Sequence, residues 1–288
     1  MEIVISNLSK KFGSTTALDN VTLKIGSGMF GLLGRNGAGK TTFMRILTTI
    51  LPKSSGTVTI CGVPVENTRE IRKMIGYLPQ DFSLYPNMTV HEAMDYLSIL
   101  SEVPRAMRNQ VIPILLDKVN LSQHQHVRIK ALSGGMKRRL GIAQALVHDP
   151  KVLIVDEPTA GLDPEERIRL RNLLNETAEE RIVIPSTHIV GDIEATCENV
   201  AVLDAGKVIF EGKTTDLALG AQGKVYKVTT TQKDLPGLRE KHIVIAATPE
   251  DGQLTARIIA NNKPNGGAVP CPPTVEDGYM LLMGGRAQ

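Results

Sequence analysis

The chain has 288 residues, of which 42% are hydrophobic and 22% charged, and this composition excludes a disordered or fibrous protein and favours a globular one with room for a large and a small domain. The net charge of +3, from 33 basic and 30 acidic residues, forms no basic tail or stripe, so we expect no nucleic-acid partner. Three widely spaced cysteines suit a reducing compartment. Without an apolar run of roughly 20 residues or the start of a signal peptide, the sequence predicts a cytoplasmic protein.

The first third of the chain is predicted to be rich in strands. Short β-prone runs between turn residues predict strands at 2–6, 21–25, 29–33, 57–60 and 75–78, with a helix beginning at Lys40. Thr89 and Glu92 have the spacing of a capping box, and Pro104 is favoured in the first turn of a helix. A helical insert is therefore expected from about residue 88 to 135.

The middle of the chain alternates between predicted helices and strands. Helices are expected at 135–148, 163–179 and 191–197, and strands at 151–155, 182–184 and 200–203. Such alternation predicts a mostly parallel sheet covered by helices. After residue 211 the pattern changes to strands at 224–231, 242–247 and 253–259, with short helices near 235–241 and 274–283. This part is predicted to be a small α+β domain.

The segment 34–41, with the sequence GRNGAGKT, fits the phosphate-binding P-loop pattern and lies between a predicted strand and a predicted helix. Its glycines allow backbone N–H groups to surround phosphates, and the helix N-terminus adds a favourable dipole. Lys40 is expected to reach the β- and γ-phosphates of ATP, while Thr41 offers a hydroxyl to Mg²⁺. The expected ATP contacts of this segment are Gly34, Arg35, Asn36, Gly37, Ala38, Gly39, Lys40, Thr41 and Thr42.

Two acidic residues follow the apolar run Val152–Val155. A buried strand would present both acids at its end, where Asp156 is expected to hold Mg²⁺. Glu157, one residue further, is then placed to orient or deprotonate a water attacking the γ-phosphate. Alone, this pattern also fits a core strand with solvated acids at its end, but the P-loop favours the catalytic interpretation.

The segment 132–139, LSGGMKRR, resembles the signature sequence of ATP-binding cassette (ABC) proteins. Ser133 with the amides of Gly134 and Gly135 would open a helix and form a second anion-binding site. The resemblance covers about residues 1–215 and implies a P-loop NTPase cassette, with a mostly parallel core sheet, an N-terminal antiparallel β subdomain and a helical insert. Residues 216–288 would then form the small C-terminal α+β accessory domain.

The resemblance also implies roles for single residues. Phe12 matches an aromatic that stacks on adenine, although a core position is the alternative; many relatives have Tyr there, and many have Gln where this chain has Met136. Gln80 matches a loop glutamine that touches Mg²⁺ and water, and His188 a histidine that contacts the γ-phosphate. In the family, Ser133, Gly134 and Gly135 complete the ATP site of the other subunit. A homodimer, or a heterodimer with a similar cassette, is therefore expected in the ATP state.

Residues 81–92, and a C-terminal helix after a small accessory domain, are similar to bacterial exporter cassettes for antibiotics, peptides and lipids. We expect an ATPase subunit that drives a separate membrane permease and lies on the inner face of the cell membrane. The alternatives are an ABC ATPase without a permease, acting on ribosomes or DNA, and a nucleotide-binding regulator without turnover. Lys40, Asp156, Glu157 and His188 argue against the regulator. The accessory domain could be a ligand site, a dimer-stabilising module or a cover for the cassette.

Overall fold

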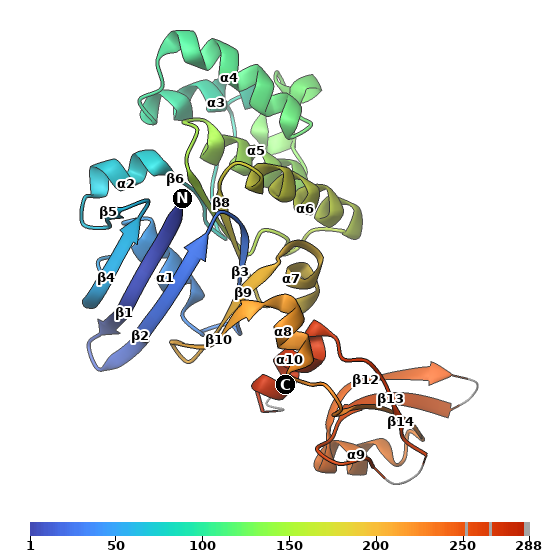
Figure 1. Ribbon diagram of the computed structural model, residues 1–288. Helices are drawn as coiled ribbons and strands as arrows, with labels where there is room; N and C mark the ends of the chain where they lie inside the picture. The colour runs from blue at the N-terminus through green and yellow to red at the C-terminus, as the bar shows by residue number, and fades with distance from the viewer. Residues whose placement is uncertain (251–252, 265–266, 285–288) are drawn as a thin grey trace. The chain divides into compact units, whose positions relative to one another are not determined.

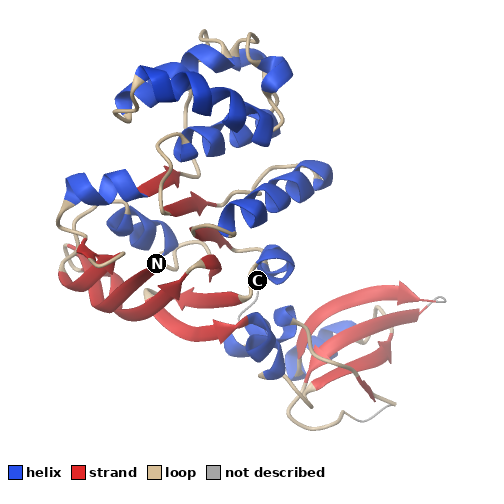
Figure 2. Ribbon diagram, turned by 45° about the horizontal axis from the view of Figure 1, so that its top comes forward, coloured by secondary structure: helices blue, strands red, loops and turns tan. Residues whose placement is uncertain are grey.

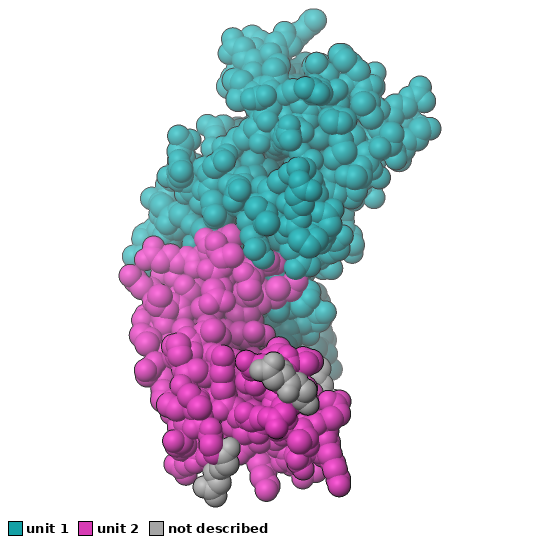
Figure 3. All heavy atoms as spheres, turned by 90° about the vertical axis from the view of Figure 1, so that its right-hand side faces the viewer, with its two compact units in different colours: residues 1–188, 201–211 teal, residues 189–200, 212–288 magenta. Residues whose placement is uncertain are grey.

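The computed structural model describes residues 1–250, 253–264 and 267–284, which divide into two compact units (Figures 1 and 3). Unit 1 contains residues 1–188 and 201–211, and unit 2 contains the described residues of 189–200 and 212–288. No helix of the described residues is both long and apolar enough to cross a bilayer.

A four-stranded sheet in the order β2-β1-β4-β5 forms the N-terminal β subdomain. All its pairs are antiparallel, as predicted. The first two strands are longer than the predicted runs because three register shifts between Ile5 and Lys11 interrupt the regular alternation of buried residues. The strands are β1 (Glu2–Phe12), β2 (Thr15–Gly26), β4 (Ser55–Ile60) and β5 (Val63–Pro64).

A six-stranded sheet in the order β10-β9-β3-β8-β7-β6 forms the core. The pairs β3–β8, β8–β7 and β7–β6 are parallel, which confirms the predicted sheet. Strand β7, which lies between β8 and the edge strand β6, is buried on both faces: Val152 and Ile154 pack in one hydrophobic cluster, Leu153 and Val155 in another. The strands are β3 (Gly28–Leu33), β6 (Ile75–Leu78), β7 (Val152–Asp156), β8 (Ile182–Thr187), β9 (Asn199–Asp204) and β10 (Lys207–Lys213).

Helices cover both faces of this sheet. Phe43 and Met44 of α1 join the cluster shared with the antiparallel sheet, while residues of α3 to α6 form the second cluster. Figure 2 shows the helices of the insert, in blue, gathered beyond one end of the core sheet. The helices are α1 (Lys40–Leu47), α2 (Thr68–Met74), α3 (Val90–Leu100), α4 (Arg105–Lys118), α5 (Gly134–Leu146) and α6 (Pro164–Ala178), with 3-10 turns at Ser122–His124 and Ile129–Ala131.

Helix starts follow the sequence signals closely. The capping box of Thr89 and Glu92 is present in both directions, at 3.2 and 2.8 Å. Asp163 caps α6 by accepting from the N–H of Glu166 at 2.9 Å. Pro104 is the residue before α4 rather than a member of its first turn. By contrast, α2 was not predicted, because it has seven residues and buries only Ile71.

Unit 2 contains an antiparallel sheet in the order β12-β13-β11-β14. Its core includes Tyr226, Val228, Ile258 and Leu235, the last from α9. The short helix α8 was not predicted. The elements are α7 (Val190–Thr196), α8 (Thr214–Leu219), β11 (Val225–Thr230), α9 (Leu235–Lys241), β12 (Ile243–Glu250), β13 (Gln253–Ile259), β14 (Val269–Pro270) and α10 (Val275–Leu282). The predicted loop 261–267 lies partly outside the described residues.

The closing helix α10 is fixed to unit 2 in two ways. Its buried Asp277 accepts hydrogen bonds from Arg257 of β13 at 2.9 Å and from Thr274 at 2.7 Å. Burial acts to raise the pKa of Asp277, but hydrogen bonds from Arg257 and Thr274 outweigh it and lower that pKa. Gly278, which interrupts the apolar pattern of the helix, lies where an added Cβ would overlap the carbonyl oxygen of Leu217 in α8.

We therefore expect Gly278→Ala to reduce the stability of unit 2 by about 1–3 kcal/mol, because α10 must move away from α8. Gly237→Ala is the matched control, since Gly237 also lies in a helix and an added Cβ there meets no atom within 4 Å. That change should be neutral or slightly stabilising. Amide hydrogen exchange in α8, α10 and β13 measures the effect. Equal protection in both variants would contradict the close-contact explanation.

Candidate functional site

The predicted P-loop forms a tight turn between β3 and α1. Gly37 and Gly39 have φ values of 82° and 107°, in the region that favours glycine. A Cβ on Gly39 would lie 2.8 Å from the carbonyl oxygen of Ala17 in β2. The Lys40 ammonium donates to the carbonyls of Gly34 at 2.6 Å and Arg35 at 3.2 Å, so its side chain curls back over the loop.

Residues from the P-loop and from three distant segments line one cavity of about 410 Å³ beside this loop. They come from the P-loop with the first turn of α1, from β2, from the segment after β6, and from the end of β7. Ala17 was not among the predicted site residues and is the contribution of β2. The lining residues are Ala17, Arg35, Asn36, Gly37, Gly39, Lys40, Thr41, Thr42, Gln80, Asp156 and Glu157.

Asp156 is fixed by hydroxyl groups from two directions. Its Oδ2 accepts from the Thr41 hydroxyl at 3.0 Å, and its Oδ1 accepts from the Ser186 hydroxyl at 2.5 Å. The side chain is only 1% exposed, so its orientation depends on these two donors. The structure thus joins two of the three residues, Thr41 and Asp156, that the sequence assigned to a metal ion.

Glu157 bends the chain out of β7. Its φ of 48° lies in the left-handed region, a conformation that costs a non-glycine residue about 1–3 kcal/mol. The Glu157 N–H donates to the carbonyl of Ser186 at 3.1 Å and to its hydroxyl at 3.2 Å. Its buried carboxylate lies 3.0 Å from His188 Nδ1 and 3.5 Å from Lys40 Nζ. A single carboxylate therefore connects the P-loop lysine to the predicted γ-phosphate histidine.

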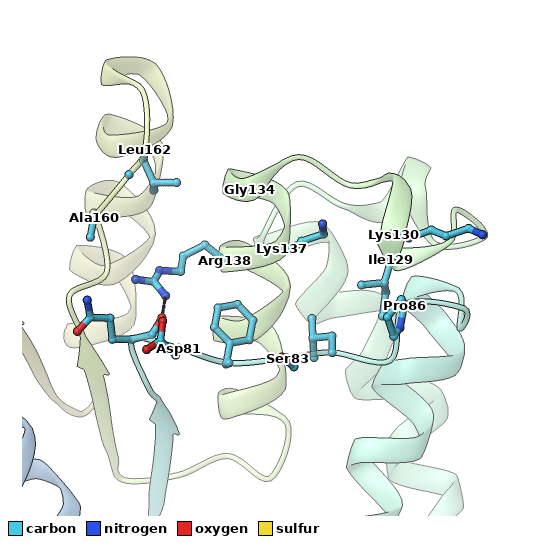
Figure 4. A pocket seen from close by; sticks show the side chains of 14 residues that line it. Asp81, Ser83, Pro86, Ile129, Lys130, Gly134, Lys137, Arg138, Ala160 and Leu162 are labelled. Atoms are coloured by element: carbon cyan, nitrogen blue, oxygen red, sulfur yellow. Dashed lines mark hydrogen bonds between the residues drawn. The ribbon is translucent and has the colours of Figure 1, made fainter.

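The signature residues lie outside this cavity. Ser133 caps α5 by accepting from the N–H of Met136 at 3.1 Å, and Ser133 and Gly134 are exposed. Gly134 instead lines a second cavity of about 810 Å³, which Gln80 also borders (Figure 4). The first turn of α5 thus borders a different cavity from the P-loop of the same chain.

Phe12 is a further predicted residue that lies outside the P-loop cavity. Its side chain is 48% exposed at the end of β1, so the alternative of a core position is wrong. The Lys10 ammonium lies over its ring, 4.9 Å from the centroid. Phe12 is not among the residues that line the P-loop cavity.

Besides Ala17, two further contributors to the site, Ser186 and Arg138, were not predicted from the sequence. Ser186 belongs to the Ser-Thr-His run, and Arg138 to the signature segment, so both lay inside recognised motifs without an assigned role. Arg138 is 7% exposed and donates to the carbonyl oxygens of Gln80, Glu157 and Pro158. No periodicity indicates such contacts, because they join segments that meet only in the folded chain.

We expect Ser186→Ala to lower the free energy of unfolding by about 1–3 kcal/mol, because Asp156 and the N–H of Glu157 each lose a buried hydrogen-bond partner. Ser98→Ala is the control: Ser98 is also fully buried, but its hydroxyl donates only to the Met94 carbonyl of its own helix. Urea unfolding of both variants without nucleotide measures the difference. Equal losses would show that the Ser186 hydroxyl has no special role.

Comparison with known proteins identifies the family. The family model described as ABC transporter matches residues 18–160. The chain is 35% identical to an uncharacterized ABC transporter ATP-binding protein, YxlF, of Bacillus subtilis, with 84% of this chain and 81% of that protein covered. It is 36% identical to Nod factor export ATP-binding protein I of Ralstonia nicotianae, with 82% and 74% covered, and 32% identical to the linearmycin resistance ATP-binding protein LnrL of Bacillus subtilis, with 83% and 76% covered.

Solved structures give the same family. A cbiO1 subunit from Clostridium perfringens, described as part of an ABC transporter complex, aligns with a TM-score of 0.70 and 29% identity, over 75% of this chain and 89% of that one. The dimeric ATP-binding cassette MJ0796 in a post-hydrolysis state with ADP and Pi aligns with a TM-score of 0.66 and 26% identity, over 73% and 98%. The chain therefore belongs to the ABC transporter ATP-binding proteins, and it is an ATP-binding, ATP-hydrolysing subunit of an ABC transporter.

Proposed function

We propose that this ATPase is the cytoplasmic motor of an exporter, with residues 1–215 as the cassette and 216–288 as its accessory domain. The observation that carries the proposed active site is the position of Glu157, whose buried carboxylate lies between Lys40 and His188 at the edge of the P-loop cavity. Nod factor export and linearmycin resistance, the functions named for two relatives, support the direction of transport. We propose that the protein is held at the inner face of the membrane by its permease.

The residues around Asp156 fit Mg²⁺. Thr41 supplies a hydroxyl oxygen, Asp156 a carboxylate and Gln80 an amide oxygen, and all three line the same cavity. Oxygen donors of these kinds are the ligands that Mg²⁺ prefers. When bound, the ion would neutralise charge on the β- and γ-phosphates.

The chain's own residues perform the remaining steps. Lys40 releases the carbonyls of its own loop and binds the β- and γ-phosphates, with the loop N–H groups around them. Glu157 accepts a proton from the attacking water. At the same time the water oxygen forms a bond to the γ-phosphorus, and the bond from that phosphorus to the ADP oxygen breaks. His188 holds the Glu157 carboxylate and contacts the γ-phosphate, while Phe12 stacks on adenine.

A second copy, or a similar cassette, completes each site in this proposal. Ser133, Gly134 and Gly135 would bind the γ-phosphate held by the other subunit. Support comes from the exposure of Ser133 and Gly134 at the start of α5 and from the dimeric state named for a solved relative.

Glu157→Gln is expected to abolish ATP turnover while ATP and Mg²⁺ now retain a dimer, because nucleotide binding survives but proton transfer does not. In the unchanged protein the rate per chain should rise with protein concentration, as a two-chain site requires. Turnover assays combined with size measurement in ATP test both effects. Glu66→Gln, which removes an exposed carboxylate of unit 1, is the control and should behave like the unchanged protein. Full turnover by Glu157→Gln would remove Glu157 from the proposed role.

Exposed apolar side chains on the insert support docking of the permease there. Five large ones lie between residues 85 and 114: Tyr85, Ile99, Leu100, Met107 and Ile114. Exposed apolar side chains that share one surface are typical of an interaction site, and two of these five border a common cavity. Leu100 and Met107 also border a cavity of about 720 Å³ whose rim carries Arg69, Arg72 and Lys73.

We expect the charged substitution Leu100→Asp to release the protein from membranes that contain its permease, because a carboxylate on an apolar contact is costly to bury. Ile50→Asp is the matched control, since Ile50 has a similar exposure of 58% against 61% but lies after α1. Sedimentation with membranes gives the bound fraction, and basal turnover shows that both variants are folded. Equal retention of the two variants would locate the docking surface elsewhere.

A further inference from the structure

Arg138 joins the two loops of the proposed active site to the signature helix. It lies in the second turn of α5, is 7% exposed, and uses all three nitrogens of its guanidinium group. Nη1 donates to the Gln80 carbonyl at 2.7 Å and Nε to the Pro158 carbonyl at 3.1 Å. Nη2 donates to the carbonyl of Glu157.

The three acceptors are backbone atoms of segments far apart in sequence. Gln80 follows β6 and Glu157 and Pro158 follow β7, so one planar group fixes the ends of two neighbouring strands relative to each other. Figure 4 shows the Arg138 side chain reaching from α5 toward the segment at Asp81, with the hydrogen bond drawn as a dashed line. The Phe82 ring, 5.7 Å from the guanidinium carbon, covers the group from another side.

The contact with Glu157 is the one that bears on catalysis. Residue 157 has a left-handed backbone, so its side-chain direction depends on the groups that hold its peptide units. Ser186 binds the N–H side, while Arg138 and the N–H of Ala160 bind the carbonyl side. Among the described hydrogen bonds to the Glu157 backbone, that of Arg138 has the only charged donor. Its loss would allow the carboxylate to turn away from the cavity.

We propose that Arg138 is a positioning residue for ATP hydrolysis: by holding the Glu157 carbonyl, it keeps the catalytic carboxylate aligned with the P-loop cavity and couples that alignment to the Gln80 loop. This proposal rests on the proposed role of Glu157 as the base. Arg138 itself touches neither nucleotide nor water in this mechanism. Lysine cannot replace it, because a single ammonium cannot match three carbonyls held in a fixed fork.

Arg138→Met should lower kcat by about 100-fold, the scale expected when a reacting group is misplaced by about 1 Å. The dissociation constant for ATP should change by less than about 3-fold, because the P-loop is intact. Arg138→Lys should also lose most of its kcat. It is the variant to measure if Arg138→Met does not fold. Arg108→Met is the matched control: Arg108 binds the Val103 carbonyl and Asp95 within the insert and reaches neither loop.

A second measurement separates positioning from loss of structure. Arg138 borders the larger cavity, so a small guanidinium ion such as methylguanidinium can reach the space left in Arg138→Ala. We expect millimolar methylguanidinium to raise the kcat of Arg138→Ala several-fold with no change in its thermal midpoint, and to leave Arg108→Met unaffected.

The outcomes distinguish this inference from the proposed function. If Glu157→Gln is inactive but Arg138→Met and Arg138→Lys keep kcat within about 2-fold of the unchanged protein, the positioning role is wrong while the base assignment stands. A kcat loss equalled by Arg108→Met, or one without rescue by methylguanidinium, also overturns it. If Glu157→Gln is fully active, Glu157 is not the base and the proposed mechanism is wrong. A low kcat of Arg138→Met would then have a cause other than misplacement of Glu157.

Discussion

Burial of β7 on both faces fixes where the acidic residues of this ATPase lie. Its four apolar residues face two separate hydrophobic clusters, so the strand cannot shift along its axis or rotate without exposing one of them. Asp156 and Glu157 follow at the carboxyl end of this strand, in a parallel sheet where neighbouring strands end at the same edge. Ligands of such sheets bind at that edge, and the P-loop after β3 opens there as well.

The residue after β7 changes the direction of the chain. Asp156 continues the strand and stays buried, whereas the left-handed backbone of Glu157 turns its carboxylate toward Lys40 and His188. Such a conformation persists only where surrounding groups hold it. Here Ser186 and Arg138 hold its two ends, so the strain and the hydrogen bonds that balance it occur at the residue proposed as the catalytic base.

Two neighbouring arginines of α5 anchor the signature helix to different parts of the chain. Arg138 binds the backbone carbonyls of the loops after β6 and β7, while Arg139 binds the Val119 carbonyl at the end of α4 and Glu166 of α6 at 3.1 Å. A movement of the signature helix would therefore displace the Gln80 loop, Glu157 and α6 together. The guanidinium group suits this task because its donors have a fixed geometry and remain charged when buried.

Local patterns in the sequence determined the P-loop with its flanking strand and helix, the acids after a buried strand, and the capping box of Thr89 and Glu92, while the alternation of helices and strands indicated the mostly parallel sheet. Each of the local features depends on residues within a few positions of one another, so spacing alone identifies it. The tertiary structure decided the exposure of Phe12, the contribution of Ala17, and the contacts of Ser186 and Arg138 with Glu157. It also decided the short elements α2 and α8, which too few residues mark in the sequence. These features join segments distant in the chain, and only folding brings their donors and acceptors within hydrogen-bond distance.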